Sequence, residues 1–131
     1  AAGAVPLFVG LASKSQAERA AVALRRLLMP GGLCTTLRHS GQQWDAPNGW
    51  APLQWIAFAG LRACGEAAFA EDLAKRWLAV VERNYLLTGQ IFEKYDVATG
   101  GVGGGGEYAV EIGFGWTNGV CLALMDTLDR C

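Results

Sequence analysis

Six glycines fall within the seven residues 100–106, and two ionisable residues, Glu107 and Tyr108, follow them directly. Glycine takes positive φ angles freely and has no Cβ, so a ligand or another stretch of backbone can approach it closely. The spacing Gly-x-Gly-x-x-Gly is formally present, but no strand–helix–strand unit surrounds it and no Gly-Lys-Ser/Thr follows it. The segment therefore favours a loop that sits against a ligand over a nucleotide-binding loop.

Carboxylates and aromatic rings gather in or beside the two segments 30–50 and 89–115. The carboxylates are Asp45, Glu93, Asp96, Glu107 and Glu111, and the rings are Trp44, Trp50, Phe92, Tyr95, Tyr108, Phe114 and Trp116. Any one of these residues could simply be solvated or packed. Together they suit a sugar, because aromatic faces stack on the C–H side of sugar rings and carboxylates bind hydroxyls and catalyse acid–base chemistry at the anomeric carbon.

Four helices are predicted to position these two segments. Apolar residues recur at helical spacing over 14–29, 51–64 and 66–88, and a fourth helix is expected to begin near Thr117. Two overlapping capping boxes, Ser13 with Gln16 and Ser15 with Glu18, precede the first helix. We therefore expect an all-α chain.

The connections between these helices differ greatly in length. Segments 30–50 and 89–115 are long, whereas a residue or two joins the second helix to the third. Long irregular loops are uncommon in compact domains unless they have a function. If consecutive helices pack antiparallel, both long loops emerge at the same end. We therefore expect an arc of a toroid of paired helices, with no sheet beyond a short hairpin in 89–115.

The composition limits the partners of this 131-residue chain. Its hydrophobic share is 52% and its mean hydropathy is +0.22, which is consistent with the apolar edges that an arc of a ring would expose. No uncharged apolar run reaches about 18 residues, so we expect no membrane span. The net charge is −1 and no basic stripe is present, which argues against a nucleic-acid partner. The first residues, AAGAVPLFVG, lack the charged start and long apolar stretch of a signal peptide.

The cysteines do not indicate a metal site. Cys34, Cys64, Cys121 and Cys131 form no Cys-x-x-Cys pair, and His39 is the only histidine. This spacing matches no familiar zinc pattern. We expect buried or incidental thiols and no bound metal.

Two segments resemble the C-terminal signatures of the trehalases, which are glycoside hydrolase family 37. They are QQWDAPNGWAPLQW at 42–55 and GGGGEY…GFGWTNGV at 103–120, with FEKYD at 92–96 between them at the family's spacing. The stretches PLFVGLAS and LRRLLMPGGLCTTL also resemble the family, so that the likeness covers essentially the whole chain. The resemblance implies an (α/α)6 barrel that hydrolyses α,α-trehalose to two glucose molecules with inversion, with no metal or organic cofactor.

The resemblance also implies roles for three residues. Glu93 matches the general base that activates the attacking water, and Glu107 matches a substrate-binding glutamate. Trp44 is similar to a tryptophan that lines the sugar site. The family's general acid, an aspartate in an earlier segment, has no counterpart here, and Asp45 is not that acid. Glu111 stands where the family usually has another sequence, which leaves its role open.

Trehalases are several hundred residues long, so this chain corresponds to roughly their last quarter. We expect residues 1–131 to be the C-terminal part of the catalytic domain, with the missing N-terminal part of the same barrel as partner, and to be inactive when isolated. The alternative is a catalytically inactive sugar-binding or structural remnant; an independent helical interaction domain would not explain both signatures. A periplasmic location is expected, with a cytoplasmic one also possible.

Overall fold

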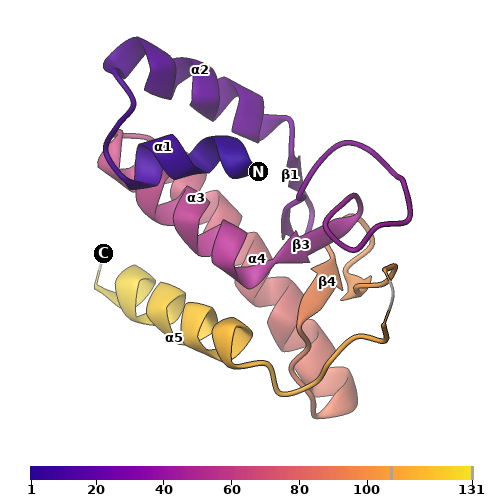
Figure 1. The fold of residues 1–131 in the computed structure, drawn as a ribbon. Coiled ribbons are helices and arrows are strands. Elements are labelled where there is room, and N and C mark those ends of the chain that lie inside the picture. The colour runs from indigo at the N-terminus through magenta and orange to yellow at the C-terminus, as the bar shows by residue number, and fades with distance from the viewer. Residues whose placement is uncertain (107, 131) are drawn as a thin grey trace.

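Three long helices dominate the structure, a computed structural model that describes residues 1–106 and 108–130. Helices α3 (Ala51–Ala63) and α4 (Ala67–Thr88) form a hairpin, and α5 (Gly115–Asp129) packs against both (Figure 1). The second and third predicted helices are confirmed almost to the residue, and the fourth begins two residues before the predicted start. The described residues are mainly helical, as predicted, although small sheets are also present.

The N-terminal elements cover one side of α3. A 3-10 helix, η1 (Ala2–Ala4), leads into the short α1 (Val5–Phe8), which packs on α3. Gly60 makes this contact possible, because a Cβ there would lie 2.8 Å from both the Cβ of Leu7 and the backbone nitrogen of Phe8. Neither short element was predicted from the sequence.

Helix α2 (Lys14–Arg25) begins at the first of the two candidate capping boxes. The Ser13 hydroxyl accepts a hydrogen bond from the backbone N–H of Gln16, and the Gln16 side chain accepts one from the N–H of Ser13. The prediction that this helix continues to residue 29 is wrong. The chain instead forms a hairpin of β1 (Leu28–Met29) and β2 (Gly32–Leu33).

A buried amide explains why this segment leaves the helix. Gln54 of α3 is fully buried, and its side-chain oxygen accepts from the Leu33 N–H at 2.7 Å. Its side-chain nitrogen donates to the Leu33 carbonyl at 2.8 Å and to the Trp50 carbonyl at 3.4 Å. These bonds hold the returning strand of the hairpin onto α3 and satisfy backbone groups that a continued helix would not have brought there.

A three-stranded sheet joins the two long loops. The predicted hairpin within 89–115 is present as β4 (Lys94–Asp96) and β5 (Gly101–Val102). The prediction of no further sheet is wrong, because β3 (Asn48–Trp50) pairs antiparallel with β4, with Gly49 opposite Tyr95. The sheet therefore places the tryptophan-rich loop, residues 30–50, beside the FEKYD segment at 92–96.

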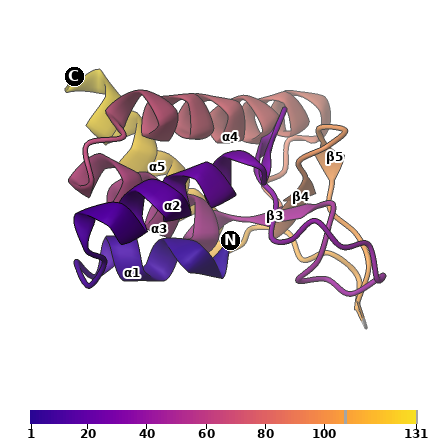
Figure 2. The same cartoon turned by 90° about the horizontal axis from the view of Figure 1, so that it is seen from above.

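The two long loops lie at the same end of the helices, as predicted (Figure 2). The Gly106 N–H donates to the Gly41 carbonyl at 3.0 Å, and the Asn48 side-chain nitrogen donates to the Gly104 carbonyl at 2.7 Å. The turn between α3 and α4 is at the other end. Residues more than 50 positions apart in the sequence thus form one loop cluster.

The core lies between the helices and beneath this sheet. The predicted inward face of α4, which consists of Phe69, Leu73, Trp77, Val80 and Val81, is buried throughout. Other apolar side chains are exposed, among them Leu86 at 77%, Leu122 at 68% and Val22 at 65%. Such faces fit the apolar edges expected of an arc.

Across the residues that the structure describes, every helix is too short or too polar to cross a membrane. Cys34 and Cys121 are buried free thiols and Cys64 is an exposed one. Cys131 lies outside the described residues.

Candidate active site

The backbone around Glu93 is fixed from three directions. The Phe92 N–H donates to the buried Tyr95 hydroxyl at 2.9 Å, and the Glu93 N–H donates to the Glu111 carbonyl at 2.9 Å. The Thr117 hydroxyl, in the first turn of α5, donates to the Phe92 carbonyl at 2.9 Å. The glutamate that the sequence singles out is therefore rigidly placed where β4 begins.

Both oxygens of the Glu93 carboxylate accept hydrogen bonds. The Tyr108 hydroxyl donates to Oε1 at 2.9 Å, and the Lys94 ammonium donates to Oε2 at 3.0 Å. The hydrogen bond to Glu93 also raises the pKa of Tyr108, because an ionised phenolate would face the carboxylate. Each carboxylate oxygen still has a second lone pair, so the group can accept a further proton or water.

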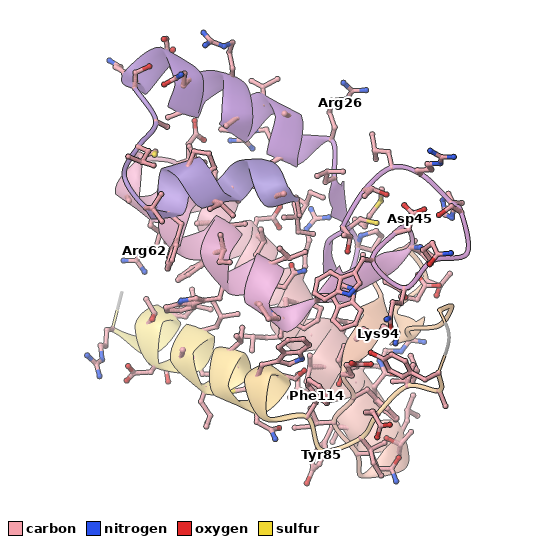
Figure 3. The ribbon with its side chains drawn as sticks, viewed as in Figure 1. Arg26, Asp45, Arg62, Tyr85, Lys94 and Phe114 are labelled. Atoms are coloured by element: carbon pink, nitrogen blue, oxygen red, sulfur yellow. The ribbon has the colours of Figure 1, made fainter. Side chains whose placement is uncertain are left out.

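The Lys94 ammonium lies inside a cage of polar and aromatic groups. The lysine is fully buried, and its ammonium also reaches the side-chain oxygen of Gln43 at 3.3 Å. It lies 5.1 Å from the ring centroid of Trp50 and 4.9 Å from that of Tyr108. Figure 3 shows Lys94 at the loop end of the domain, between the Asp45 loop and the start of α5.

Three tryptophans form a continuous aromatic surface beside this cage. Trp44 stacks on Trp50 with ring centroids 3.9 Å apart and an interplanar angle of 3°, while Trp116 meets Trp50 edge-on at 5.7 Å. The indole N–H of Trp50 donates to the Gln43 carbonyl at 3.0 Å, which fixes its orientation. Trp50 is buried, whereas Trp44 remains 45% exposed and can offer its outer face to a ligand.

Asp45 supports the loop that carries Trp44. Its carboxylate accepts hydrogen bonds from the hydroxyls of Ser40 and Thr36, from the Ser40 N–H at 2.8 Å and from the Ala46 N–H at 2.9 Å. These bonds, with Ser40 foremost, lower the pKa of Asp45 to about 2. A carboxylate with all its contacts inside its own loop is a structural support and is not free for acid catalysis.

Acid should loosen this loop in a way that depends on Asp45. Because the pKa of Asp45 is depressed to about 2 in the folded state, its stabilising effect is complete above the unfolded value of about 3.9 and is lost as the pH falls through about 2. The Ser40 amide resonance, followed by NMR from pH 5 to about pH 1, should shift over this range. An Asp45→Asn variant should lack that transition, and an unchanged transition in the variant would assign it to another group.

The glycines of the 100–106 segment permit close contact between the two loops. A Cβ on Gly103 would lie 2.8 Å from both the Asn48 side-chain oxygen and the Lys94 side chain. Gly105 has φ of +75°, and a Cβ there would lie 2.8 Å from the Gly41 carbonyl. The backbone approach expected from the sequence therefore takes place, and its partner here is the tryptophan-rich loop.

The structure brings two of the three predicted site residues into one cluster. Trp44 stacks on Trp50, Lys94 lies over the Trp50 ring, and Lys94 binds Glu93. Glu107 lies outside the described residues.

The other loop carboxylates lie elsewhere. Asp96 accepts from the N–H groups of Ala98 and Thr99 and closes the turn between β4 and β5. Glu111 is exposed, and it is its backbone carbonyl that contacts Glu93. Neither arrangement suggests a catalytic acid.

Sequence reasoning missed three polar residues of the site. Lys94, Gln43 and Asn48 link the loops, and none was singled out beforehand. No local signal marked Lys94, because lysine side chains are mostly exposed and the sequence does not show which groups this one contacts.

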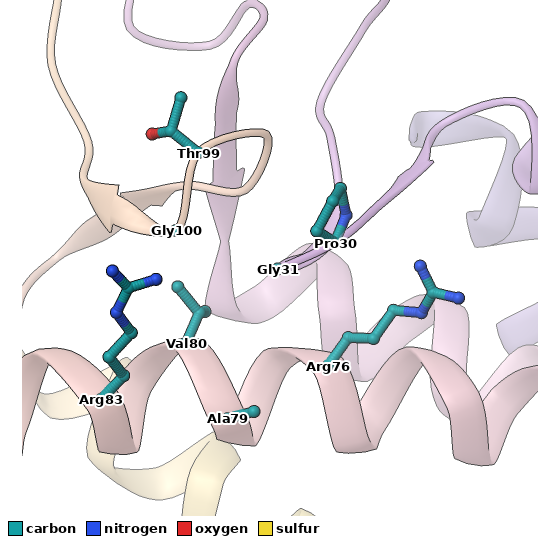
Figure 4. Close-up of a pocket in the computed structure, with 8 residues that line it drawn as sticks. All are labelled: Pro30, Gly31, Arg76, Ala79, Val80, Arg83, Thr99 and Gly100. Atoms are coloured by element: carbon teal, nitrogen blue, oxygen red, sulfur yellow. The ribbon is translucent and has the colours of Figure 1, made fainter.

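A separate pocket lies over α4, away from Glu93. Figure 4 shows that its lining comprises Pro30, Gly31, Arg76, Ala79, Val80, Arg83, Thr99 and Gly100. Arg76 pairs with Asp72 at 2.9 Å, and the lining contains no carboxylate. The pocket lacks the groups that glycoside hydrolysis requires.

No metal-binding cluster accompanies the site within residues 1–106 and 108–130. There, the histidine, cysteine, aspartate and glutamate side chains nowhere gather in groups of three or more suited to a metal ion. The polar groups near Glu93 are instead an ammonium, a phenol and an amide.

Comparison with known proteins gives consistent matches. The trehalase family model matches residues 1–129. The periplasmic trehalase of Pseudomonas aeruginosa is 57% identical over 127 residues, covering 95% of this chain and 23% of the relative. That of Xanthomonas oryzae pv. oryzae is 53% identical over 128 residues, covering 96% of this chain and 22% of the relative. The chain thus spans less than a quarter of these relatives' length.

Solved structures agree. The neutral trehalase of Saccharomyces cerevisiae superposes with a TM-score of 0.75 at 36% identity, over 92% of this chain and 22% of the yeast chain. A family 63 mannosylglycerate hydrolase of Thermus thermophilus, solved with glucose, gives 0.66 at 29% identity, over 93% of this chain and 29% of the other. The helices form an arc of the (α/α)6 barrel of these glycoside hydrolases. The chain belongs to the trehalase family.

Proposed function

We propose that residues 1–131 form the C-terminal part of the catalytic domain of an inverting trehalase, and supply one side of its active site. The observation that carries this proposal is the Glu93 carboxylate, held by Tyr108 and Lys94 next to a partly exposed tryptophan surface. Family membership gives the substrate class, because the relatives are named trehalases. Those named periplasmic also favour a periplasmic location for this chain.

In the proposed mechanism Glu93 is the general base. It takes a proton from a water molecule that attacks the anomeric carbon, while an acid from the remainder of the barrel protonates the bridging oxygen. In an inverting enzyme the two carboxyl groups lie about 6.5–9.5 Å apart, which leaves room for that water. Trp44 stacks on a glucose ring and Glu107 binds hydroxyls. Carboxylates alone carry out this acid–base chemistry.

The isolated chain lacks the acid and should not hydrolyse trehalose. A chimaera that joins residues 1–129 to the remainder of the Pseudomonas aeruginosa periplasmic trehalase, in place of the matching segment, should hydrolyse it. We call this protein the trehalase chimaera. The measurement is glucose release from trehalose by the isolated chain and by the chimaera at equal concentrations. The sequence identity of 57% over this segment favours compatible contacts with the remainder of the barrel.

Two outcomes would contradict the proposal. A folded trehalase chimaera that binds trehalose without hydrolysing it would support the alternative of an inactive sugar-binding remnant. A folded chimaera that neither binds nor hydrolyses trehalose would remove the chain from trehalose chemistry. Circular dichroism and a single cooperative unfolding transition establish that the chimaera is folded.

A further inference from the structure

The Lys94 side chain is enclosed by the groups that it contacts. The residue is fully buried, and two of its ammonium hydrogens are directed at Glu93 Oε2 and Gln43 Oε1. The faces of Trp50 and Tyr108 lie over the remaining charge at 5.1 and 4.9 Å. An ammonium group that is satisfied in this way acts only through the groups that it contacts.

The cage suits a charged lysine and not a neutral one. Burial of an unpaired ammonium is strongly unfavourable, whereas a carboxylate at 3.0 Å and two aromatic faces compensate for it. The same contact compensates Glu93, which is 2% exposed. The pair is therefore mutually dependent, because removing one charge leaves the other buried and unpaired.

We infer that Lys94 is a positioning residue for Glu93, whose carboxylate it holds in one orientation through the bond to Oε2. The inference rests on the proposed role of Glu93 as the base. Tyr108, which follows the glycine segment 100–106, holds Oε1 of Glu93. Gln43, in the tryptophan-rich loop, holds the Lys94 ammonium. The orientation of the base therefore depends on three segments that meet only in the folded protein.

Among the described residues around the pair, Lys94 is the group whose positive charge balances the Glu93 carboxylate. In the described part of the chain, the salt bridge to Lys94 is the only one that Glu93 makes. Tyr108 is titratable but donates as a neutral phenol, and Glu111 is a further charged group near it among the described residues. The contacts from the tryptophan-rich loop and from α5, which are Gln43, Trp50 and Thr117, carry no charge.

The first test is a double-mutant cycle on turnover in the trehalase chimaera. Lys94→Met keeps the length of the side chain and removes its charge, and it should lower kcat about tenfold with KM nearly unchanged, the scale of a lost charge-assisted hydrogen bond. In a Glu93→Gln background the same change should lower kcat less than about twofold, because no charged base remains to be positioned. An equal fold-loss in both backgrounds would overturn the inference.

The exposed pair Glu71 and Lys75 on α4 is a matched control. Their charged atoms are 3.7 Å apart, and the Lys75 side chain is 67% exposed. Lys75→Met, alone and with Glu71→Gln, should leave kcat within about twofold of the parent, since exposed pairs contribute little. A tenfold loss from Lys75→Met would show that loss of any lysine charge lowers kcat, which would overturn the specific role of Lys94.

The second test needs no catalysis and uses urea unfolding of the 131-residue chain. Lys94→Met should lower the unfolding midpoint more than the double variant Glu93→Gln/Lys94→Met, because only the single variant buries an unpaired carboxylate. A double variant that unfolds as readily as the single one would overturn the inference. If Glu93→Gln leaves kcat unchanged while this stability coupling is present, the proposed base is wrong although the pair itself is real.

Discussion

Replacing Glu93 with glutamine in the trehalase chimaera should lower kcat at least about 100-fold, the lower range for loss of acid–base assistance. The amide keeps the shape of the carboxylate and can still accept from Tyr108, but it cannot take a proton from water. Substrate contacts do not change, so KM should stay within a few-fold of the parent. Steady-state hydrolysis of trehalose, with kcat and KM determined separately, measures the effect.

Glu71→Gln is the matched control for this substitution. Glu71 lies on α4, where its carboxylate faces the exposed Lys75, and its replacement should leave kcat within about twofold of the parent. A Glu93→Gln chimaera that turns trehalose over at the parent rate would show that another group is the base. A rise in KM with kcat unchanged would instead assign Glu93 to substrate binding.

The helices of this chain are predictable because their signals are local. The apolar face of α4 repeats every three to four residues, and the capping box at Ser13 marks the start of α2. These patterns depend on neighbours within one helical turn. The layout followed from loop lengths alone, since a short turn between α3 and α4 forces the two long loops to the same end.

Strands β1, β2 and β3 were missed because their signals are not local. β1 and β2 have two residues each, which is too short for a period-2 pattern to be visible. Their position depends on Gln54, which bonds to Leu33 from a helix 21 residues away. Helix α2 therefore ends at Arg25, before Leu27 and Leu28, for a reason that only the tertiary structure supplies.

Some residues of the candidate site could likewise be predicted from the sequence, and others could not. Glu93 and Trp44 were recognisable because each lies within a continuous segment that resembles the trehalases. Lys94 and Gln43 matter through a contact between residues 51 positions apart, and base rates place lysine at the surface. The resemblance thus identified the group proposed to react, whereas the residues that orient it required coordinates.

Replacing Trp77 with alanine should remove a large share of the stability of the 131-residue chain. The side chain is fully buried in the centre of α4, and substitution of such a residue costs about 3–5 kcal/mol through lost burial and the cavity left behind. Domains of this kind have only about 5–15 kcal/mol in total. Urea unfolding followed by circular dichroism measures the loss, with Trp44→Ala as control.

The comparison between the two tryptophans separates the core from the site. Trp44 is 45% exposed, and its stack on Trp50 is worth about 0.5–1.5 kcal/mol, so Trp44→Ala should shift the unfolding midpoint much less. Equal losses from the two variants would contradict a core centred on α4.

Trp77→Ala should also change the surroundings of Tyr95, the ring that lies between Trp77 and the backbone next to Glu93. Trp77 meets Tyr95 edge-on at 5.4 Å, and the Tyr95 hydroxyl accepts the N–H of Phe92, the residue before the proposed base. Burial raises the pKa of Tyr95 to about 12. In folded Trp77→Ala protein the cavity should admit water and lower that pKa toward its ordinary value, while Trp77→Phe should retain more of the shift. Ultraviolet titration of the Tyr95 phenol measures this pKa. A Tyr95 pKa that is unchanged in Trp77→Ala would mean that Trp77 does not keep water away from Tyr95.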